Sequence, residues 1–347
     1  MEIVRVGGSL SSSCITIEEQ ADIGKARRTA AALASGLSFS ETLAGNVALL
    51  VTEAAKNLLK HAGCGQVILR VFESGDAAGI EMLALDKGPG IADIGRCFQD
   101  GYSTAGTAGT GLGAIARLSS MYDVYSRPNQ GTVLMAQVWK RGAAGVVPAS
   151  HFLAGGISVP VRGEVECGDG WIFQESARAV RLVVADGLGH GPLAAAAAEA
   201  AVRTAREHID EPALRLLERI HGVLRPTRGA AVAVAEINSQ SQVLRFAGVG
   251  NITAAIVPAS GPVRHLMSHA GTAGHEVRKI VEFTSPWSSR SLLLMHSDGL
   301  QTRWSFDSYP GLLERHPSVI AAVLYRDYAR GRDDVTVVAA REAARES

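Results

Sequence analysis

ALDKGPGIADIGRCFQDGYSTAGTAGTGLGAIARL, residues 84–118, is unusually rich in glycine. Its glycines stand at positions 88, 90, 95, 101, 106, 109, 111 and 113. Glycine loses more backbone entropy on folding than any other residue, so such a density indicates a use, typically close approach of the backbone to a ligand. The stretch therefore predicts a ligand-binding loop, with a flexible surface loop as the ordinary alternative.

One dinucleotide-binding pattern occurs inside this stretch. GTGLGA at 109–114 satisfies GxGxxG/A, but that fingerprint normally follows a strand and precedes an acidic residue about 20 positions later. Here YSTAGTA precedes it and PNQGTV occupies the later position. The context disfavours a dinucleotide.

The preceding helix carries a polar stripe. Apolar spacing predicts helices over 18–35 and 40–61, the second with Ser38 and Glu41 as a capping box. Within the second helix, four polar residues at i, i+4, i+7 and i+8 share a face: Glu53, Asn57, Lys60 and His61. Such a stripe suits a metal ligand at Asn57, a proton acceptor at Glu53 and a phosphate contact at Lys60, although a solvated helix face is the simpler interpretation.

The joint pattern is more specific than its parts. ExxxNxxKH (53–61), DxGxG (86–90) and GTGLG (109–113) resemble, in order and spacing, the ATP-binding boxes of the gyrase, chaperone and histidine-kinase (GHKL) superfamily. DKGPGIADI followed by QDGYSTAG is most similar to the stressosome switch kinases and anti-sigma factor kinases. A histidine kinase proper would need a helical hairpin with a phosphoacceptor histidine, and the residues before 40 contain no histidine.

The resemblance implies a GHKL (Bergerat) α/β sandwich over residues 1–141 that binds ATP and Mg²⁺. Glu53 would be the catalytic base, Asn57 would hold Mg²⁺, and Asp86 would bind the adenine amino group. Gly88 and Gly90 would let the backbone approach the base, while the lid would offer N–H groups to the phosphates. The nucleotide-binding residues implied are Asn57, Lys60, His61, Asp86, Gly88, Gly90, Thr104, Gly109, Thr110, Gly111, Leu112 and Gly113.

The second half has aspartates at or near the predicted ends of strands, and apolar runs lead into Asp186 and Asp298. The aspartates are Asp169, Asp186, Asp298, Asp333 and Asp334. Convergent carboxylates suit a pair of hard cations such as Mg²⁺ or Mn²⁺. For any single Asp-Gly pair, a simple turn remains the ordinary interpretation.

The set GDG, ADGLGHG, RGAAVAV, FAGVGN, HSDG and DDVTVV resembles the metal-dependent PPM-type phosphatases, in the bacterial branch of the sporulation and stressosome feedback phosphatases. It implies an αββα sandwich over residues 151–347 with two Mn²⁺ or Mg²⁺ ions. Asp186 would bridge both ions, Gly187 would offer a carbonyl, Asp298 and Asp333 would hold one ion, and Asp169 would be a further ligand. The reaction implied is hydrolysis of phosphoserine or phosphothreonine by metal-activated water, without a phosphoenzyme.

Two further patterns point to other chemistry. Cys64 and Arg70 fit the Cx5R spacing of cysteine phosphatases, but QVIL between them predicts a strand that would separate thiol and guanidinium. His265, His269 and His275 lack the glutamate of HExxH, so a zinc site is disfavoured.

Composition limits the remaining choices. A length of 347 residues predicts two domains, and small residues with a proline at 142–150 predict the linker. Equal numbers of basic and acidic side chains, 34 each, disfavour nucleic-acid and membrane partners. The four cysteines form no CxxC pattern and no signal peptide is evident, which predicts a cytoplasmic protein.

The function expected is a two-domain α+β regulator with serine kinase and phosphatase activities. The resemblances imply a STAS-domain partner, an anti-sigma antagonist or a stressosome scaffold, and further contacts with a sigma factor or a downstream phosphatase. Two alternatives stay open: an active phosphatase governed by an ATP-sensing domain that transfers no phosphate, and an anti-sigma factor that sequesters sigma directly.

Overall fold

The computed structural model describes residues 4–6, 12–74, 77–97, 111–140, 150–176 and 179–343. The chain divides into two compact units, residues 12–147 and residues 1–11 with 148–347. No helix in these described ranges is long and apolar enough to cross a membrane.

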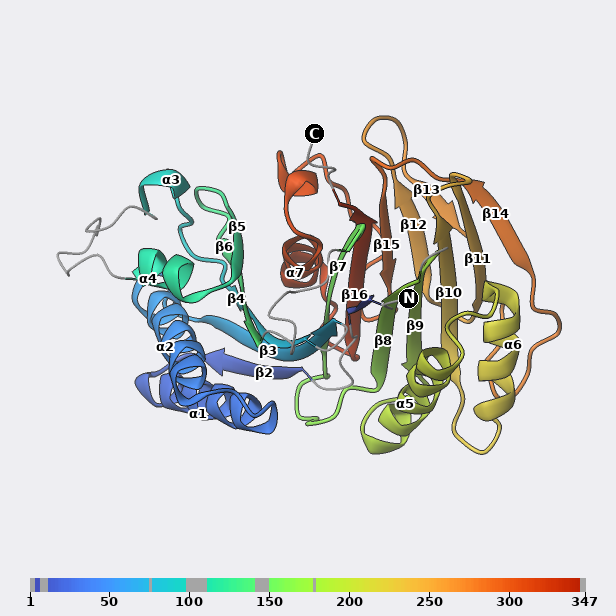
Figure 1. The fold of residues 1–347 in the computed structure, drawn as a ribbon, viewed down its shortest axis with the longest axis horizontal. Coiled ribbons are helices and arrows are strands. Elements are labelled where there is room, and N and C mark those ends of the chain that lie inside the picture. The colour runs from blue at the N-terminus through green and yellow to red at the C-terminus, as the bar shows by residue number, and fades with distance from the viewer. Residues whose placement is uncertain are drawn as a thin grey trace. The chain divides into compact units, whose positions relative to one another are not determined.

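The first unit is a sheet covered on one face by helices (Figure 1). Its elements are β2 (Ser13–Ile17), α1 (Gln20–Gly36), α2 (Glu41–Asn57), the π-helix η1 (Leu58–Ala62), β3 (Gly65–Ser74), β4 (Ala77–Leu85), α3 (Ile94–Cys97), α4 (Gly111–Leu118), β5 (Met121–Ser126) and β6 (Thr132–Lys140). The strands pair antiparallel in the order β2-β3-β4-β6-β5. Apolar side chains of α1, α2 and α4 form one core with this sheet. This is the expected α/β sandwich.

Two local features of this unit differ from the sequence expectation. A strand without a helical pattern precedes the helices, because SCITI forms β2 at the sheet edge. The cap of α2 is Ser40, whose Oγ accepts from the Leu43 N–H at 3.3 Å, whereas Ser38 lies outside the helix with φ of 52°. A side-chain oxygen at the true boundary satisfies a free N–H of the first turn, and Ser38 is two positions too early.

The second unit is a four-layer αββα sandwich. One sheet has the order β1-β8-β9-β10-β11-β14 and the other β13-β12-β15-β16-β7. The strands are β1 (Val4–Val6), β7 (Phe152–Val159), β8 (Asp169–Glu175), β9 (Val180–Gly187), β10 (Ala230–Asn238), β11 (Val243–Val249), β12 (Thr253–Val257), β13 (Arg264–Leu266), β14 (Glu282–Pro286), β15 (Leu292–His296) and β16 (Val335–Glu342). A core of both inner faces, with Trp171, Phe173 and Phe246 among its members, joins the sheets.

Helices cover the two outer faces of this sandwich (Figure 1). α5 (Pro192–Glu207) and α6 (Ala213–Val223) pack on the first sheet, and α7 (Pro317–Tyr328) packs on β7 and β16, with the short 3₁₀ helix η2 (Leu312–Glu314) before it. The strands are buried on both faces, which explains the continuous apolar runs that precede the aspartates.

The first residues belong to the second unit. Val4–Val6 pair antiparallel with β8, at Val4↔Glu175 and Val6↔Phe173, whereas the sequence placed residues 1–141 in the ATP-binding domain. A short strand pairs through backbone groups that any exposed sheet edge offers, so local sequence does not identify its partner. Of the expected linker 142–150, all but Ser150 lies outside the described residues.

Candidate active sites

The expected nucleotide-binding helix is interrupted at its polar stripe. α2 ends at Asn57, and η1 continues the chain with i→i+5 hydrogen bonds. The prediction of one α-helix over 40–61 was therefore wrong in its last turn, because Leu58–Ala62 form a π-helix. Such π segments are often associated with functional sites.

Glu53, the expected base, has an ion-pair partner on its own helix. Its Oε1 lies 2.9 Å from Lys56 Nζ, and its side chain is 17% exposed. A free carboxylate would accept a proton from a substrate hydroxyl directly. Here the Lys56 ammonium competes for that oxygen.

Asn57 lies against the first turn of α4. A Cβ placed on Gly111 would stand 3.2 Å from Asn57 Oδ1 and 3.4 Å from Nδ2. The fold thus brings the expected Mg²⁺ ligand beside the helix N-terminus expected to receive phosphates. Gly111 tolerates no side chain without displacing this amide.

The Asp86 carboxylate is held by the loop that follows it. Asp86 Oδ1 accepts from the Gly88 N–H at 2.8 Å and the Thr132 N–H at 3.2 Å. Burial, followed by the charge of Lys60, lowers the pKa of His61, and the Asp86 carboxylate opposes this shift. The charges of His61 and Asp86 therefore interact electrostatically.

The protein itself accounts for glycine at positions 88 and 90. A Cβ on Gly88 would lie 2.6 Å from Ala62 Cβ, and one on Gly90 would lie 2.0 Å from the Arg127 carbonyl oxygen. Gly90 also has a φ of +69°, in the region that glycine favours. Contact with a base was expected at both glycines, but packing within the unit is sufficient to require glycine there.

The lid lies only partly within the described residues. Thr104, Gly109 and Thr110 fall outside them. Gly111, Leu112 and Gly113 form the first turn of α4, where Leu112 packs against the core and Gly113 is buried.

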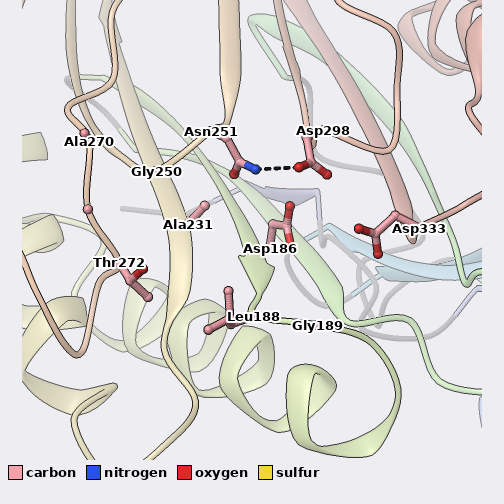
Figure 2. Close-up of a pocket in the computed structure, with 11 residues that line it drawn as sticks. Asp186, Leu188, Gly189, Ala231, Gly250, Asn251, Ala270, Thr272, Asp298 and Asp333 are labelled. Atoms are coloured by element: carbon pink, nitrogen blue, oxygen red, sulfur yellow. Dashed lines mark hydrogen bonds between the residues drawn. The ribbon is translucent and has the colours of Figure 1, made fainter.

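The second site lies where strands of both sheets end. Asp169 begins β8 and pairs in register with Asp186 near the end of β9. Asp298 follows β15, and Asp333 precedes β16. Asp186, Asp298 and Asp333 line one cavity of about 400 Å³ (Figure 2).

The carboxylates of this second site oppose one another electrostatically. Burial, then the charges of Asp169 and Asp298, raises the pKa of Asp186 to about 9. Burial raises the pKa of Asp169 to about 7. Burial and the charge of Asp333 also raise the pKa of Asp298. Such a cluster carries its full negative charge only when cations compensate it.

Hydrogen bonds hold the carboxylates that flank this cavity. Ser297 Oγ donates to Asp169 Oδ2 at 2.7 Å, and Asn251 Nδ2 donates to Asp298 Oδ2 at 2.5 Å. The backbone N–H groups of Val161 and Gly168 donate to Asp334 at 2.6 and 2.7 Å.

Gly187, the expected carbonyl donor, is closely packed beneath the site. Its N–H donates to Gly168 O at 2.9 Å, and a Cβ would lie 2.1 Å from the Ala194 carbonyl oxygen of α5.

The donor set fits hard divalent cations, which prefer carboxylate oxygens. Across the described ranges, no three His, Cys, Asp or Glu side chains are close enough to hold one ion by themselves. Binding would therefore need other oxygen ligands or movement of the loops that carry Asp298 and Asp333.

Sequence reasoning missed the uncharged wall of this cavity. Asn251 stood in the quoted motif FAGVGN, but its side chain received no role. The segment Ala270–Thr272 also lines the cavity, as do Leu188 and Ala231. The signal available in the sequence was a polar residue, Asn251, directly after a glycine. In the structure Gly250 has a φ of +94°, as a turn before Asn251 requires.

The two competing patterns are dispersed in the structure. Cys64 is exposed, whereas Arg70 is buried within β3, where its Nε lies 2.6 Å from Glu81 Oε1. The strand therefore separates the thiol from the guanidinium, as predicted. His269 stacks on Phe283, while His275 contacts the Thr227 carbonyl.

Comparisons with known proteins agree with both halves. Residues 18–137 match the family described as Histidine kinase-like ATPase domain, and residues 176–342 match Stage II sporulation protein E (SpoIIE). The first unit is a GHKL-like ATPase domain, and the second is a PP2C-like (PPM-type) phosphatase domain. The chain belongs to the RsbT-like family through its first unit and carries a SpoIIE-type second unit.

Two curated relatives come from Bacillus subtilis (strain 168). The serine/threonine-protein kinase RsbT is 33% identical over 129 residues, which is 37% of this chain and 97% of RsbT. The phosphoserine phosphatase RsbX is 25% identical over 138 residues, which is 40% of this chain and 69% of RsbX. A solved structure from the bacterial stressosome, described as a modular system adapted to control secondary messenger signaling, has a TM-score of 0.51 and 28% identity. It covers 55% of this chain and 100% of that one.

Proposed function

We propose that this protein is a bifunctional regulator: an ATP-dependent serine/threonine kinase and a metal-dependent phosphoserine/phosphothreonine phosphatase that act on a STAS-domain protein. The observation that carries the proposal is the convergence of Asp186, Asp298 and Asp333 on one cavity, in a chain whose other unit is similar to RsbT. The similarity to RsbX and to a stressosome component supports a partner of the anti-sigma antagonist or scaffold type.

For the phosphatase, Asp186 would bridge two Mg²⁺ or Mn²⁺ ions, with Asp298 and Asp333 on one of them and Asp169 and the Gly187 carbonyl nearby. When bound, such ions activate water and neutralise phosphoryl charge. The protein's own contribution is orientation. Asn251 fixes the Asp298 carboxylate, and Ser297 fixes that of Asp169.

For the kinase, Asn57 would hold Mg²⁺ and Asp86 would bind the adenine amino group. Lys60, His61 and the N–H groups of Gly111–Gly113 would contact the phosphates. Thr104, Gly109 and Thr110 would complete the lid. Glu53 would accept the proton of the acceptor hydroxyl, while positioning and charge neutralisation would contribute most of the rate.

One observation favours the second candidate, a phosphatase governed by an ATP-sensing unit that transfers no phosphate. Glu53 is paired with Lys56, and a base engaged in this way is less available to a substrate hydroxyl. Both candidates retain ATP at the first unit and phosphatase chemistry at the second. They differ in whether phosphate moves from ATP to a protein.

The test is incubation of the full chain with labelled ATP and a candidate STAS-domain protein. Wild type, Glu53→Ala and Asp186→Ala are compared, each with and without Mn²⁺. Accumulation of phosphoprotein by Asp186→Ala but not by Glu53→Ala would support the bifunctional proposal. If Asp186→Ala accumulates none, the kinase is wrong, and if wild type removes no phosphate with Mn²⁺, the phosphatase is wrong. Stable co-purification with a sigma factor would instead support the anti-sigma alternative.

A further inference from the structure

A second cavity lies beside the acidic one. It measures about 370 Å³ and is lined by Asp298, Gln301, Arg330, Arg332 and Asp333. Asp298 and Asp333 also line the first cavity, so these two carboxylates are shared by a cavity that contains Asp186 and one that contains two arginines.

The arginine segment is tied to the segment that follows Asp298. The Arg330 N–H donates to Gly299 O at 2.9 Å, and the Gln301 N–H donates to Tyr328 O at 3.0 Å. Leu300 and Ala329 form an isolated antiparallel bridge. The backbone thereby fixes where the Arg330 side chain starts relative to Asp298.

Both guanidinium groups are available. Arg330 and Arg332 are exposed, and neither has an ion-pair partner among the residues that the structure describes. By contrast, the nearby Arg326 is paired with Asp327 at 2.8 Å. A free guanidinium presents a planar fork of donors that matches the oxygens of phosphate and carboxylate groups.

We propose that Arg330 and Arg332 form an anion subsite that receives anionic oxygens of the phosphatase substrate. The proposal rests on the phosphatase function proposed above. The acidic cavity alone would repel a dianionic phosphoryl group, whereas two adjacent cations attract it toward the carboxylates that would hold the metal ions. The oxygens can belong to the phosphoryl group itself or to acidic side chains that flank the phosphoserine.

The test uses the full chain with Mn²⁺ and the double variant Arg330→Gln/Arg332→Gln. Turnover is measured on p-nitrophenyl phosphate and on two synthetic phosphoserine peptides, one flanked by glutamates and one by alanines. Inorganic phosphate serves as inhibitor. We expect KM to rise about tenfold, as the loss of charge-assisted hydrogen bonds predicts, while kcat changes less than about twofold.

The pattern of the increase identifies the source of the oxygens. A rise in KM for all three substrates, with weaker inhibition by phosphate, assigns the arginines to the phosphoryl group. A rise for the glutamate-flanked peptide alone assigns them to flanking carboxylates. Unchanged KM values and unchanged phosphate inhibition would overturn the proposal.

Control variants separate charge from structure. Arg330→Lys/Arg332→Lys should recover part of the affinity, and high salt should raise the wild-type KM more than that of the glutamine variant. Arg290→Gln changes an exposed arginine before β15, at the strand end opposite Asp298, and should behave as wild type. An equal KM rise in Arg290→Gln would also overturn the proposal.

A failure of the proposed phosphatase function can be told apart from a failure of the proposed anion subsite. If wild type does not hydrolyse p-nitrophenyl phosphate with Mn²⁺, that proposal fails, and calorimetric titration with inorganic phosphate tests the subsite directly. Binding by wild type and loss in the double variant support it. Equal binding, or none, counts against it.

Discussion

Asn251 Nδ2 donates a hydrogen bond to Asp298 Oδ2 at 2.5 Å, across the cavity that Asp186 and Asp333 also line (Figure 2). Asn251 precedes β12 and Asp298 follows β15, and these neighbouring strands pair antiparallel with Thr253 opposite His296, so the contact lies just beyond the end of that strand pair. The amide holds one carboxylate of the proposed metal set in a single orientation. This makes Asn251 a positioning residue, whose loss should be visible in metal affinity.

Asn251→Ala should weaken Mn²⁺ binding about tenfold, since partners that orient metal ligands typically contribute 10–100-fold in affinity. The hydrogen bond also lowers the pKa of Asp298, so its removal favours the protonated, non-ligating carboxyl. Calorimetric Mn²⁺ titration of the full chain measures the effect. The matched control is Asn238→Ala. It removes an amide at the end of β10, whereas Ala231 at the start of that strand lines the cavity. Equal Mn²⁺ affinity in all three proteins would exclude this role.

Metal-free protein should lose stability as pH rises. Burial raises the folded-state pKa of Asp186 from its ordinary 3.8 to about 9, so the folded state binds more protons than the unfolded state between these values. The destabilisation therefore begins above about pH 4 and is complete only above about pH 9. Thermal melts in chelator from pH 5 to pH 8.5 should show a falling Tm for the second unit.

Asp186→Asn provides the counterpart to that pH series, because it removes the titrating group. Its Tm should fall less steeply with pH and should exceed that of wild type at pH 8.5. Mn²⁺ should raise the Tm of wild type more than that of the variant, since a ligand that binds only the folded state stabilises it. A wild-type Tm that increases with pH in chelator would contradict the assignment of Asp186.

Release of Glu53 from Lys56 should test the proposed base. If Glu53 accepts the substrate proton, Lys56→Ala should increase phosphate transfer from ATP, because the 2.9 Å ion pair no longer occupies the carboxylate. Glu53→Gln should reduce transfer by about 10²-fold or more, the usual contribution of a general base. Transfer is followed in an Asp186→Ala background to prevent dephosphorylation. Lys25→Ala, an exposed lysine of α1, is the control. No transfer in any variant would favour the ATP-sensing alternative.

Gly90→Ala should destabilise the first unit. The added Cβ would lie 2.0 Å from the Arg127 carbonyl oxygen, at a φ of +69°, and forced left-handed conformations cost about 1–3 kcal/mol before any steric term. Gly36→Ala is the matched control, because its Cβ would meet nothing within 4 Å and its φ is not positive. In calorimetric melting, the Tm of the first unit should fall in Gly90→Ala and should not change in Gly36→Ala. Equal melting of both variants would show that the loop adjusts freely.

Much of the fold was predictable because each prediction depended on local periodicity. The stretches at 191–207 and 212–224 carry helical apolar spacing, and α5 and α6 form within them. The final apolar run forms β16. The continuation of α2 as a π-helix after Asn57 was not predictable, because the residues from Leu58 to Ala62 are compatible with an ordinary α-helix.

The sequence alone determined the two-domain class, the nature of each unit, and the identity of the acidic residues at strand ends. Periodicity reports which face of an element is buried, and motif spacing reports which residues stand near each other along the chain. Only the tertiary structure decided which residues from different elements meet: Gly111 with Asn57, Asn251 with Asp298, and two arginines beside Asp333. Those distances depend on strand order and on packing between layers, and neither leaves a signal in local sequence.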